Sequence, residues 1–209
     1  MSVINRIAHF QNRRDEVPNQ ELASDLAARK DSAGIQEIAE GLWQKDKNVR
    51  ADCIKVLYEV GYIDPALIAD YVEDFIKLLK SSNNRLVWGG MIALGTVAGL
   101  KADVIFAHLA EIQKAMNEGS VITMDNGVQT LARAAAADAG YNQAIFPYLL
   151  EHLRTCRPKD VAQHAEKTLP AVQGANKAGF IAVLEKRAID LSGSALARVN
   201  RVVKTAAAR

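Results

Sequence analysis

The side chains that most often do chemistry are few in this chain and lie far apart along it. Of its four histidines, no two are four residues apart, the spacing that lets two imidazoles on one helix face bind a metal ion. The segment Gly90–Thr96 has the glycines of a phosphate-binding loop but lacks the lysine, and its apolar residues indicate helix packing. No serine lies in the nucleophile elbow of a hydrolase. The sequence therefore predicts no catalytic residue, no metal ligand and no cofactor.

A different group of side chains is suited to binding. In the predicted helix Asp46–Gly61 one stripe is apolar, and at 100° per residue Asp52, Lys55 and Glu59 point away from it. Equivalent positions recur in three later helices. The candidate partner-binding residues on this face are Asp52, Lys55, Glu59, Arg85, Trp88, Ile92, Asp125, Asn126, Gln129, Arg133, His164 and Lys167.

Trp88 and Ile92 are large, apolar and one helical turn apart, which is unusual for a solvated face. Trp88 either packs beneath a neighbouring helix or serves as an anchor for a partner. The charges of the face balance, with Lys55, Arg85, Arg133 and Lys167 against Asp52, Glu59, Asp125 and Asp160. Phosphate binding requires a surplus of positive charge, so the balance favours a protein or peptide partner over nucleic acid.

The helices that carry these residues repeat along the chain. Leu57, Leu94, Leu131 and Leu169 are spaced 37, 37 and 38 residues apart. The same register aligns four small residues, Cys53, Gly90, Gly127 and Ala165, and further apolar columns in the helix before each copy. A fixed period of this length is typical of a solenoid of helix pairs, in which each apolar stripe is buried only against neighbouring repeats.

The run Asp46-x-x-Val49-Arg50-x-x-Cys53 resembles the opening of the inner helix in HEAT repeats, although later repeats lack the Asp and the Arg. The resemblance covers roughly residues 31–173. It implies an all-α fold, a right-handed α-α superhelix of about four HEAT-like helix pairs, whose concave surface is the candidate face. We expect a single domain over residues 1–209, with capping helices in residues 1–30 and 174–209 and the repeats between them.

Packing within the repeats can also be predicted. Cys53 should be buried in the small-residue column, and Gly90 in the same column should permit close helix approach, while Gly89 should point outward. Trp43 should pack between helices. The last helix should close the core through an apolar stripe of Leu196, Val199 and Val203.

Three glycines are each followed by an apolar residue, at Gly61, Gly99 and Gly140. This pairing is typical of a helix that ends with a glycine in the left-handed conformation. With the helical columns, it predicts eleven to twelve helices and no sheet.

Composition limits the class of protein. The chain has 209 residues, of which 49% are hydrophobic and 24% charged, as expected of an ordinary globular unit. Its net charge of +2 is small for a dedicated nucleic-acid binder, although residues 174–209 carry a local +5. No apolar run reaches membrane-spanning length, and residues 1–10 lack a signal-peptide pattern, so we expect a cytoplasmic protein with reduced cysteines and no membrane partner.

These observations predict a non-catalytic HEAT-repeat binding or scaffold protein that holds a protein or peptide on its concave face. An alternative is a protein acting on nucleic acid, similar to the HEAT-like alkylpurine DNA glycosylases, which use concave aromatic residues with a catalytic aspartate. Trp88 and Asp125 occupy equivalent positions in adjacent repeats. A further option, a HEAT-type chaperone or lyase handling a chromophore, has no dedicated ligand residues here.

Overall fold

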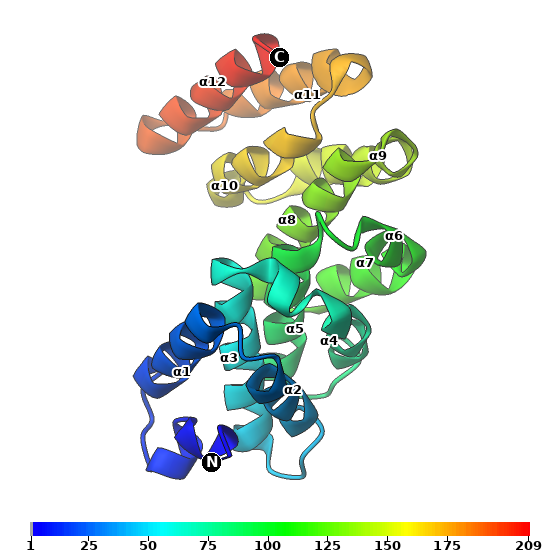
Figure 1. Cartoon of the computed structure of the whole chain (residues 1–209). Coiled ribbons are helices and arrows are strands. Elements are labelled where there is room, and N and C mark those ends of the chain that lie inside the picture. The colour runs from blue at the N-terminus through cyan, green and yellow to red at the C-terminus, as the bar shows by residue number, and fades with distance from the viewer. Residues whose placement is uncertain (1) are drawn as a thin grey trace. The chain divides into compact units, whose positions relative to one another are not determined.

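The computed structural model describes residues 2–209, which form helices and no strand (Figure 1). The all-α prediction and the expected number of helices are confirmed. The α-helices are α1 (Val17–Arg29), α2 (Ser32–Gly41), α3 (Lys47–Ile63), α4 (Val72–Leu78), α5 (Asn84–Val97), α6 (Ala102–Ala107), α7 (Leu109–Glu118), α8 (Val121–Ala137), α9 (Ala139–Thr155), α10 (Pro158–Thr168), α11 (Gly174–Ala188) and α12 (Gly193–Ala207). The short 3-10 helices are η1 (Ile4–Arg6), η2 (His9–Gln11), η3 (Pro65–Leu67), η4 (Ala69–Tyr71) and η5 (Leu169–Ala171). Within residues 2–209, no helix combines the length and apolarity needed to cross a lipid bilayer.

The helices form two compact units, one ending at Gly127 and the other comprising Val128–Arg209. In the first unit α3 is the central helix and packs against α1, α2 and α5. Asp46 caps α3 by accepting hydrogen bonds from the backbone N–H groups of Asn48 and Val49, which satisfies two otherwise unpaired donors. Cys53 and Leu57 are fully buried, as predicted, and burial raises the pKa of the Cys53 thiol to about 12.

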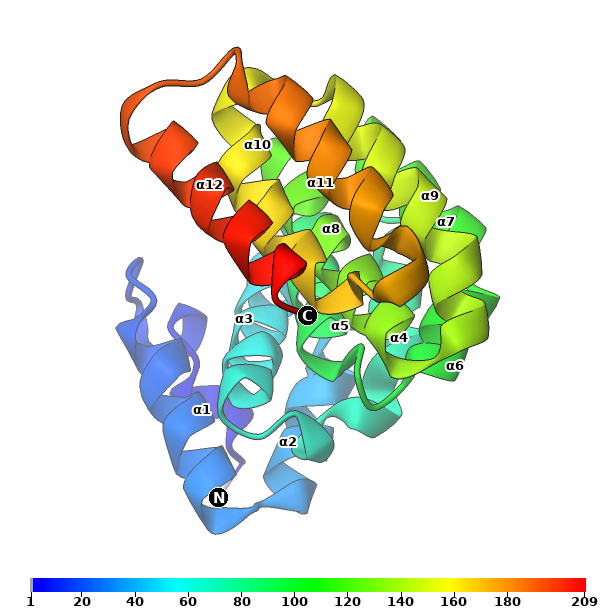
Figure 2. The same cartoon turned by 90° about the horizontal axis from the view of Figure 1, so that it is seen from above.

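In the second unit α12 packs against α10 and α11, and the three lie side by side in Figure 2. Val199 is buried as predicted, whereas Leu196 and Val203 are only half-buried. Val202 completes the buried stripe together with Val199 and Ala206, so the prediction was one residue off at Val203 alone. Arg198 reaches from α12 to Glu166 of α10 with two hydrogen bonds, Nε to Oε1 at 2.9 Å and Nη2 to Oε2 at 2.5 Å.

The prediction of left-handed glycines at helix ends is wrong. Gly61 lies inside α3, where an added Cβ would meet Oγ1 of Thr96 at 2.3 Å, and Gly140 lies in the first turn of α9. Among the described residues, Gly193 is the glycine with a positive φ. Trp43 is also not packed between helices, since it is 49% exposed.

Two adjacent glycines let α5 approach its neighbours closely. A Cβ at Gly90 would lie 3.0 Å from the carbonyl oxygen of Phe75 in α4, which confirms the predicted close approach. Gly89 does not point outward as expected. It is buried, and a Cβ there would lie 2.9 Å from Cγ1 of Ile54 on α3. The pair therefore serves two helix contacts, that of Gly89 with α3 and that of Gly90 with α4.

We predict that Gly89→Ala destabilises the protein by about 1–3 kcal/mol, because the branched Ile54 side chain is held in a helix and cannot move away freely. The matched control is Gly179→Ala on α11, where the nearest side-chain atom would lie 3.7 Å away. That change should instead stabilise by about 0.5–1 kcal/mol through helix propensity. Urea denaturation of both variants measures the change in the free energy of unfolding. Equal changes in the two variants would contradict a close contact between Gly89 and Ile54.

A second prediction concerns the pH dependence of α12 docking. The hydrogen bond from Arg198 lowers the pKa of the Glu166 carboxyl, so the pair stabilises the fold above the ordinary glutamate pKa and is lost as the pH falls through the lowered value. Arg198→Gln should lower the melting temperature by about 1–3 °C at pH 7. The difference from the unchanged protein should shrink as the pH falls below the ordinary glutamate pKa, and it should vanish once the pH is below the lowered pKa of Glu166. Lys204→Gln on the same helix is the charge-matched control, and a pH-independent difference would exclude the pair as its cause.

Candidate partner-binding site

The inner faces of α3 and α5, together with the segment preceding α1, enclose a pocket of about 580 Å³ in the first unit. Four of the predicted partner-binding residues, Asp52, Lys55, Arg85 and Trp88, line it. The N-terminal segment contributes much of the polar wall, with His9, Asn12, Arg13, Arg14, Asp15 and Glu16, and α1 adds Asn19. The face predicted to be solvated is therefore partly covered by residues that were expected only to cap the end of the first repeat.

Hydrogen bonds to α3 and α1 fix this segment in place. The backbone N–H of His9 donates to Oδ2 of Asp52 at 2.8 Å. The N–H of Ala8 donates to Oδ1 of Asn19 at 2.9 Å, and Asn19 is itself buried. Asp52 thus has a structural partner, and it contributes to the pocket wall rather than presenting an unpaired carboxylate.

Lys55 was predicted to point into solvent, but the structure shows that it does not. Its side chain is only 11% exposed, and Nζ lies 2.7 Å from Oε2 of Glu16 and 2.6 Å from Oε1 of Glu59. Burial by itself would lower the pKa of Lys55, but the hydrogen bonds to these two glutamates outweigh it and raise the pKa above its ordinary value. The ammonium therefore stays charged and engaged, and it is not available to a partner.

Two other cations of the pocket remain accessible. Arg13 is paired with Asp15 at 2.8 Å, but Arg14 and Arg85 are exposed, and within residues 2–209 neither guanidinium has an acidic partner. The carboxylates of the pocket therefore already have hydrogen-bond partners, whereas two of its guanidinium groups do not.

Trp88 provides the aromatic surface of the pocket. Its side chain is half-buried, with its ring centroid 6.5 Å from that of Tyr58 and the planes tilted by 52°. Tyr58 is 5% exposed, and burial raises the pKa of its phenol to about 12. Trp88 is thus neither a core residue nor fully exposed, and part of its ring can contact a partner. Ile92, one turn further on, is also half-buried but does not line the pocket.

The remaining predicted residues lie elsewhere. Asp125 and Asn126 are half-buried on α8. Gln129, Arg133 and Lys167 line a smaller pocket of about 290 Å³ in the second unit. His164 does not belong to an outward face, because its side chain is 1% exposed and its Nδ1 lies 2.8 Å from Nε2 of His152. Four residues of the predicted set therefore line the first-unit pocket and three line the second-unit pocket, while five line neither, namely Glu59, Ile92, Asp125, Asn126 and His164.

Sequence reasoning missed Arg14 and Tyr58. The cluster Arg13–Glu16 immediately before Pro18 was visible as a break in the apolar pattern, but nothing in a helical period shows that it folds over α3. Tyr58 was overlooked because it lies one residue after Leu57 and so falls outside the repeating apolar columns. Its ring instead faces Trp88 of α5.

Comparison with known proteins reveals similar structures but no similar sequences. No protein-family model and no curated protein sequence matches the chain. An engineered protein known from a crystal structure is 17% identical, with a TM-score of 0.68, over 100% of this chain and 98% of that chain. A designed armadillo repeat protein in complex with the peptide (KR)4 is 12% identical, with a TM-score of 0.69, over 90% and 86% of the two chains.

The structure of Kap121p bound to Pho4p is 13% identical, with a TM-score of 0.65, over 96% of this chain and 22% of the other. The chain has the fold of armadillo- and HEAT-type helical-repeat proteins. This confirms the architecture that the sequence resemblance implied. At these identities the comparison establishes the fold alone.

Because Trp88 is half-buried against one ring, its truncation should cost less than that of a core residue. We predict that Trp88→Ala lowers the stability by about 1–2 kcal/mol, against about 3–5 kcal/mol for a fully buried tryptophan. The melting temperature should fall by a few degrees. Trp43→Ala, at an exposed position outside the pocket, is the control. A loss as large as that of a core tryptophan would show that Trp88 is a structural residue.

Proposed function

We propose that this chain is a non-catalytic binding module and that the first-unit pocket holds an acidic peptide segment of a partner protein. The observation that carries the proposal is the combination of two accessible guanidinium groups, Arg14 and Arg85, with a half-exposed tryptophan in one pocket. A scaffold role in the cytoplasm is part of the same proposal.

Arginine suits a carboxylate partner for geometric reasons. The planar guanidinium donates two parallel hydrogen bonds to the two oxygens of one carboxylate, which adds specificity to the charge attraction. A glutamate or aspartate side chain of a peptide satisfies Arg85 in this way, and a second acidic residue can reach Arg14. Since Lys55 is already held by Glu16 and Glu59, these two arginines determine which charge the pocket accepts.

Trp88 supplies the apolar part of the contact. Tryptophan and arginine are the residues that most often dominate binding energy, particularly where a rim excludes water from them. Here the N-terminal segment forms such a rim on one side of the pocket. An apolar residue of the peptide next to its acidic residue would cover the exposed part of the ring.

The similar structures support binding as the kind of function. The designed armadillo protein was solved with a peptide and Kap121p with Pho4p, so this fold presents surfaces that hold other chains. The peptide of the designed protein is basic, whereas the cations here belong to the pocket, which favours a ligand of opposite charge. The alternative of a glycosylase-like enzyme gains no support from these comparisons.

The proposal can be tested with the fluorescence of Trp88. The chain has two tryptophans, so Trp43→Phe leaves Trp88 as the single indole reporter. We expect a glutamate-rich peptide with interspersed leucines to change its emission on saturable binding, and a (Lys-Arg)4 peptide of similar length not to. Arg85→Glu should weaken binding at least tenfold, the loss expected for a buried charged contact of about 1.4 kcal/mol or more.

The control variant is Lys80→Glu, which reverses a charge outside the pocket and should leave peptide binding unchanged. Tighter binding of the basic peptide, or no saturable binding of either, would contradict the proposal. Displacement of the acidic peptide by a single-stranded oligonucleotide at physiological salt, with an affinity that falls steeply with salt, would indicate a phosphate ligand instead.

A further inference from the structure

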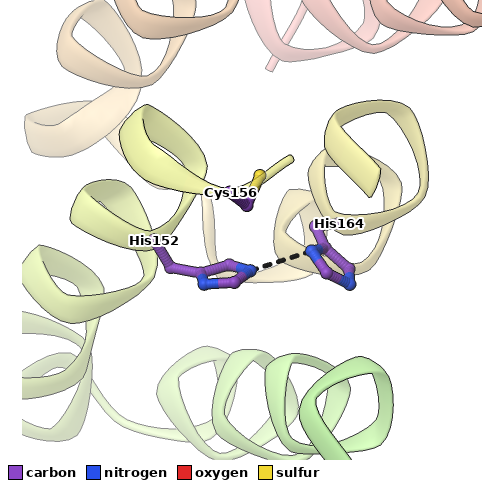
Figure 3. A group of neighbouring side chains, drawn as sticks. All are labelled: His152, Cys156 and His164. Atoms are coloured by element: carbon purple, nitrogen blue, oxygen red, sulfur yellow. Dashed lines mark hydrogen bonds between the residues drawn. The ribbon is translucent and has the colours of Figure 1, made fainter. Parts of the chain in front are cut away.

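Three side chains with metal-binding atoms meet in the second unit. His152 lies near the end of α9, Cys156 follows that end, and His164 lies on α10 (Figure 3). Their ligand atoms all lie within 4.8 Å of one another, and a ring nitrogen of each histidine points toward the other, with Nε2 of His152 2.8 Å from Nδ1 of His164. We propose that these three side chains form a binding site for a transition-metal ion, with Zn²⁺ as the best match.

The donor set determines the kind of ion. Imidazole nitrogens and a thiolate are ligands that Zn²⁺ prefers, whereas Ca²⁺ and Mg²⁺ take oxygen ligands. Zinc binds nitrogen at about 2.0–2.1 Å and sulfur at about 2.3 Å, so a tetrahedral ion holds two nitrogens roughly 3.3 Å apart and a nitrogen and a sulfur roughly 3.6 Å apart. The two imidazole nitrogens need to separate by about half an ångström, and the Cys156 sulfur, which lies within 4.8 Å of both, needs to approach to roughly 3.6 Å.

The backbone that carries Cys156 is fixed from a third helix. Arg187 of α11 donates to the carbonyl oxygens of Leu153 and Arg154 at 2.8 and 2.7 Å, and to that of Cys156 at 2.8 Å. These bonds satisfy carbonyls at the end of α9 and hold the thiol near the histidine pair. Supporting hydrogen bonds of this kind orient metal ligands and strengthen binding.

Solvent can reach the cluster from one side. His164 is 1% exposed, whereas His152 and Cys156 are half-buried. Three protein ligands leave the fourth tetrahedral position for water or for a group of a bound partner. The ion would link the end of α9 to the middle of α10, and so tie together the two helices on which the second unit's terminal pair, α11 and α12, packs. Because the folded site binds the ion and the unfolded chain lacks the geometry, binding should stabilise the fold.

The site was invisible to sequence spacing for a physical reason. A metal pair on one helix needs two histidines one turn apart, but His152 and His164 are on successive helices that run back against each other. The sequence prediction of no metal ligand considered only the first arrangement.

The test uses the full-length protein after treatment with a chelator, and titrates it with Co²⁺ followed by Zn²⁺. We expect one Co²⁺ per chain, with a sulfur-to-cobalt charge-transfer band and the strong visible absorption of tetrahedral cobalt, both abolished by Zn²⁺. Free Zn²⁺ at a hundred times its dissociation constant should raise the melting temperature by about 5–10 °C.

Cys156→Ser and His152→Gln, both at half-buried positions, should each remove the cobalt band and the zinc-induced rise in melting temperature. Cys53→Ala and His108→Gln change the other thiol and a histidine outside the cluster, and should leave both signals intact. Circular dichroism of all four variants checks that each one is folded. Absence of stoichiometric binding, an octahedral cobalt spectrum without the sulfur band, or binding that survives both Cys156→Ser and His152→Gln would each overturn the proposal.

Discussion

The buried ammonium of Lys55 is the interaction on which the first unit's inner face depends. A charge removed from water costs several kcal/mol unless close partners compensate it, and here Glu16 and Glu59 both lie within 2.7 Å. Glu16 belongs to the segment before α1, while Glu59 is on α3 itself. One ammonium thus connects the chain's N-terminal segment to its central helix, and the wall of the pocket follows from that connection.

The electrostatic character of the pocket is a consequence of this pairing. Lys55, Glu16 and Glu59 satisfy one another, Asp52 accepts the N–H of His9, and Asp15 is held by Arg13. The accessible charges that remain belong to Arg14, which precedes α3 in the sequence, and to Arg85, which follows it. A face whose formal charges cancel therefore presents two accessible guanidinium groups, since the carboxylates beside them already have hydrogen-bond partners in the fold.

How far the sequence could predict the molecule depends on the residue considered. The columns of Leu57 and Cys53 and the glycine at position 90 were predictable, because helical packing requires apolar and small residues at a fixed period. The environments of Gly89, Trp43, Lys55 and His164 were not. The N-terminal segment covers Lys55, and the return of α10 against α9 brings His164 to His152. Gly89 instead packs on Ile54 of α3, and Trp43 is left exposed after α2, because the period gives the spacing of the helices but not the exact rotation of each one. The period thus determines the core, while the polar sites arise where the chain departs from it.

The central claim is that Arg85 selects an acidic ligand through a direct charge contact in this pocket. A charge-swap measurement tests it most directly, using Arg85→Glu with a peptide in which each glutamate of the binding sequence is replaced, one at a time, by lysine. The account predicts that one of the lysine-substituted peptides binds Arg85→Glu more tightly than the parent peptide binds Arg85→Glu. The same substituted peptide should bind the unchanged protein more weakly than the parent peptide does. If no single substitution restores binding to Arg85→Glu, and the losses from the two changes simply add, Arg85 does not contact the peptide and the account is contradicted.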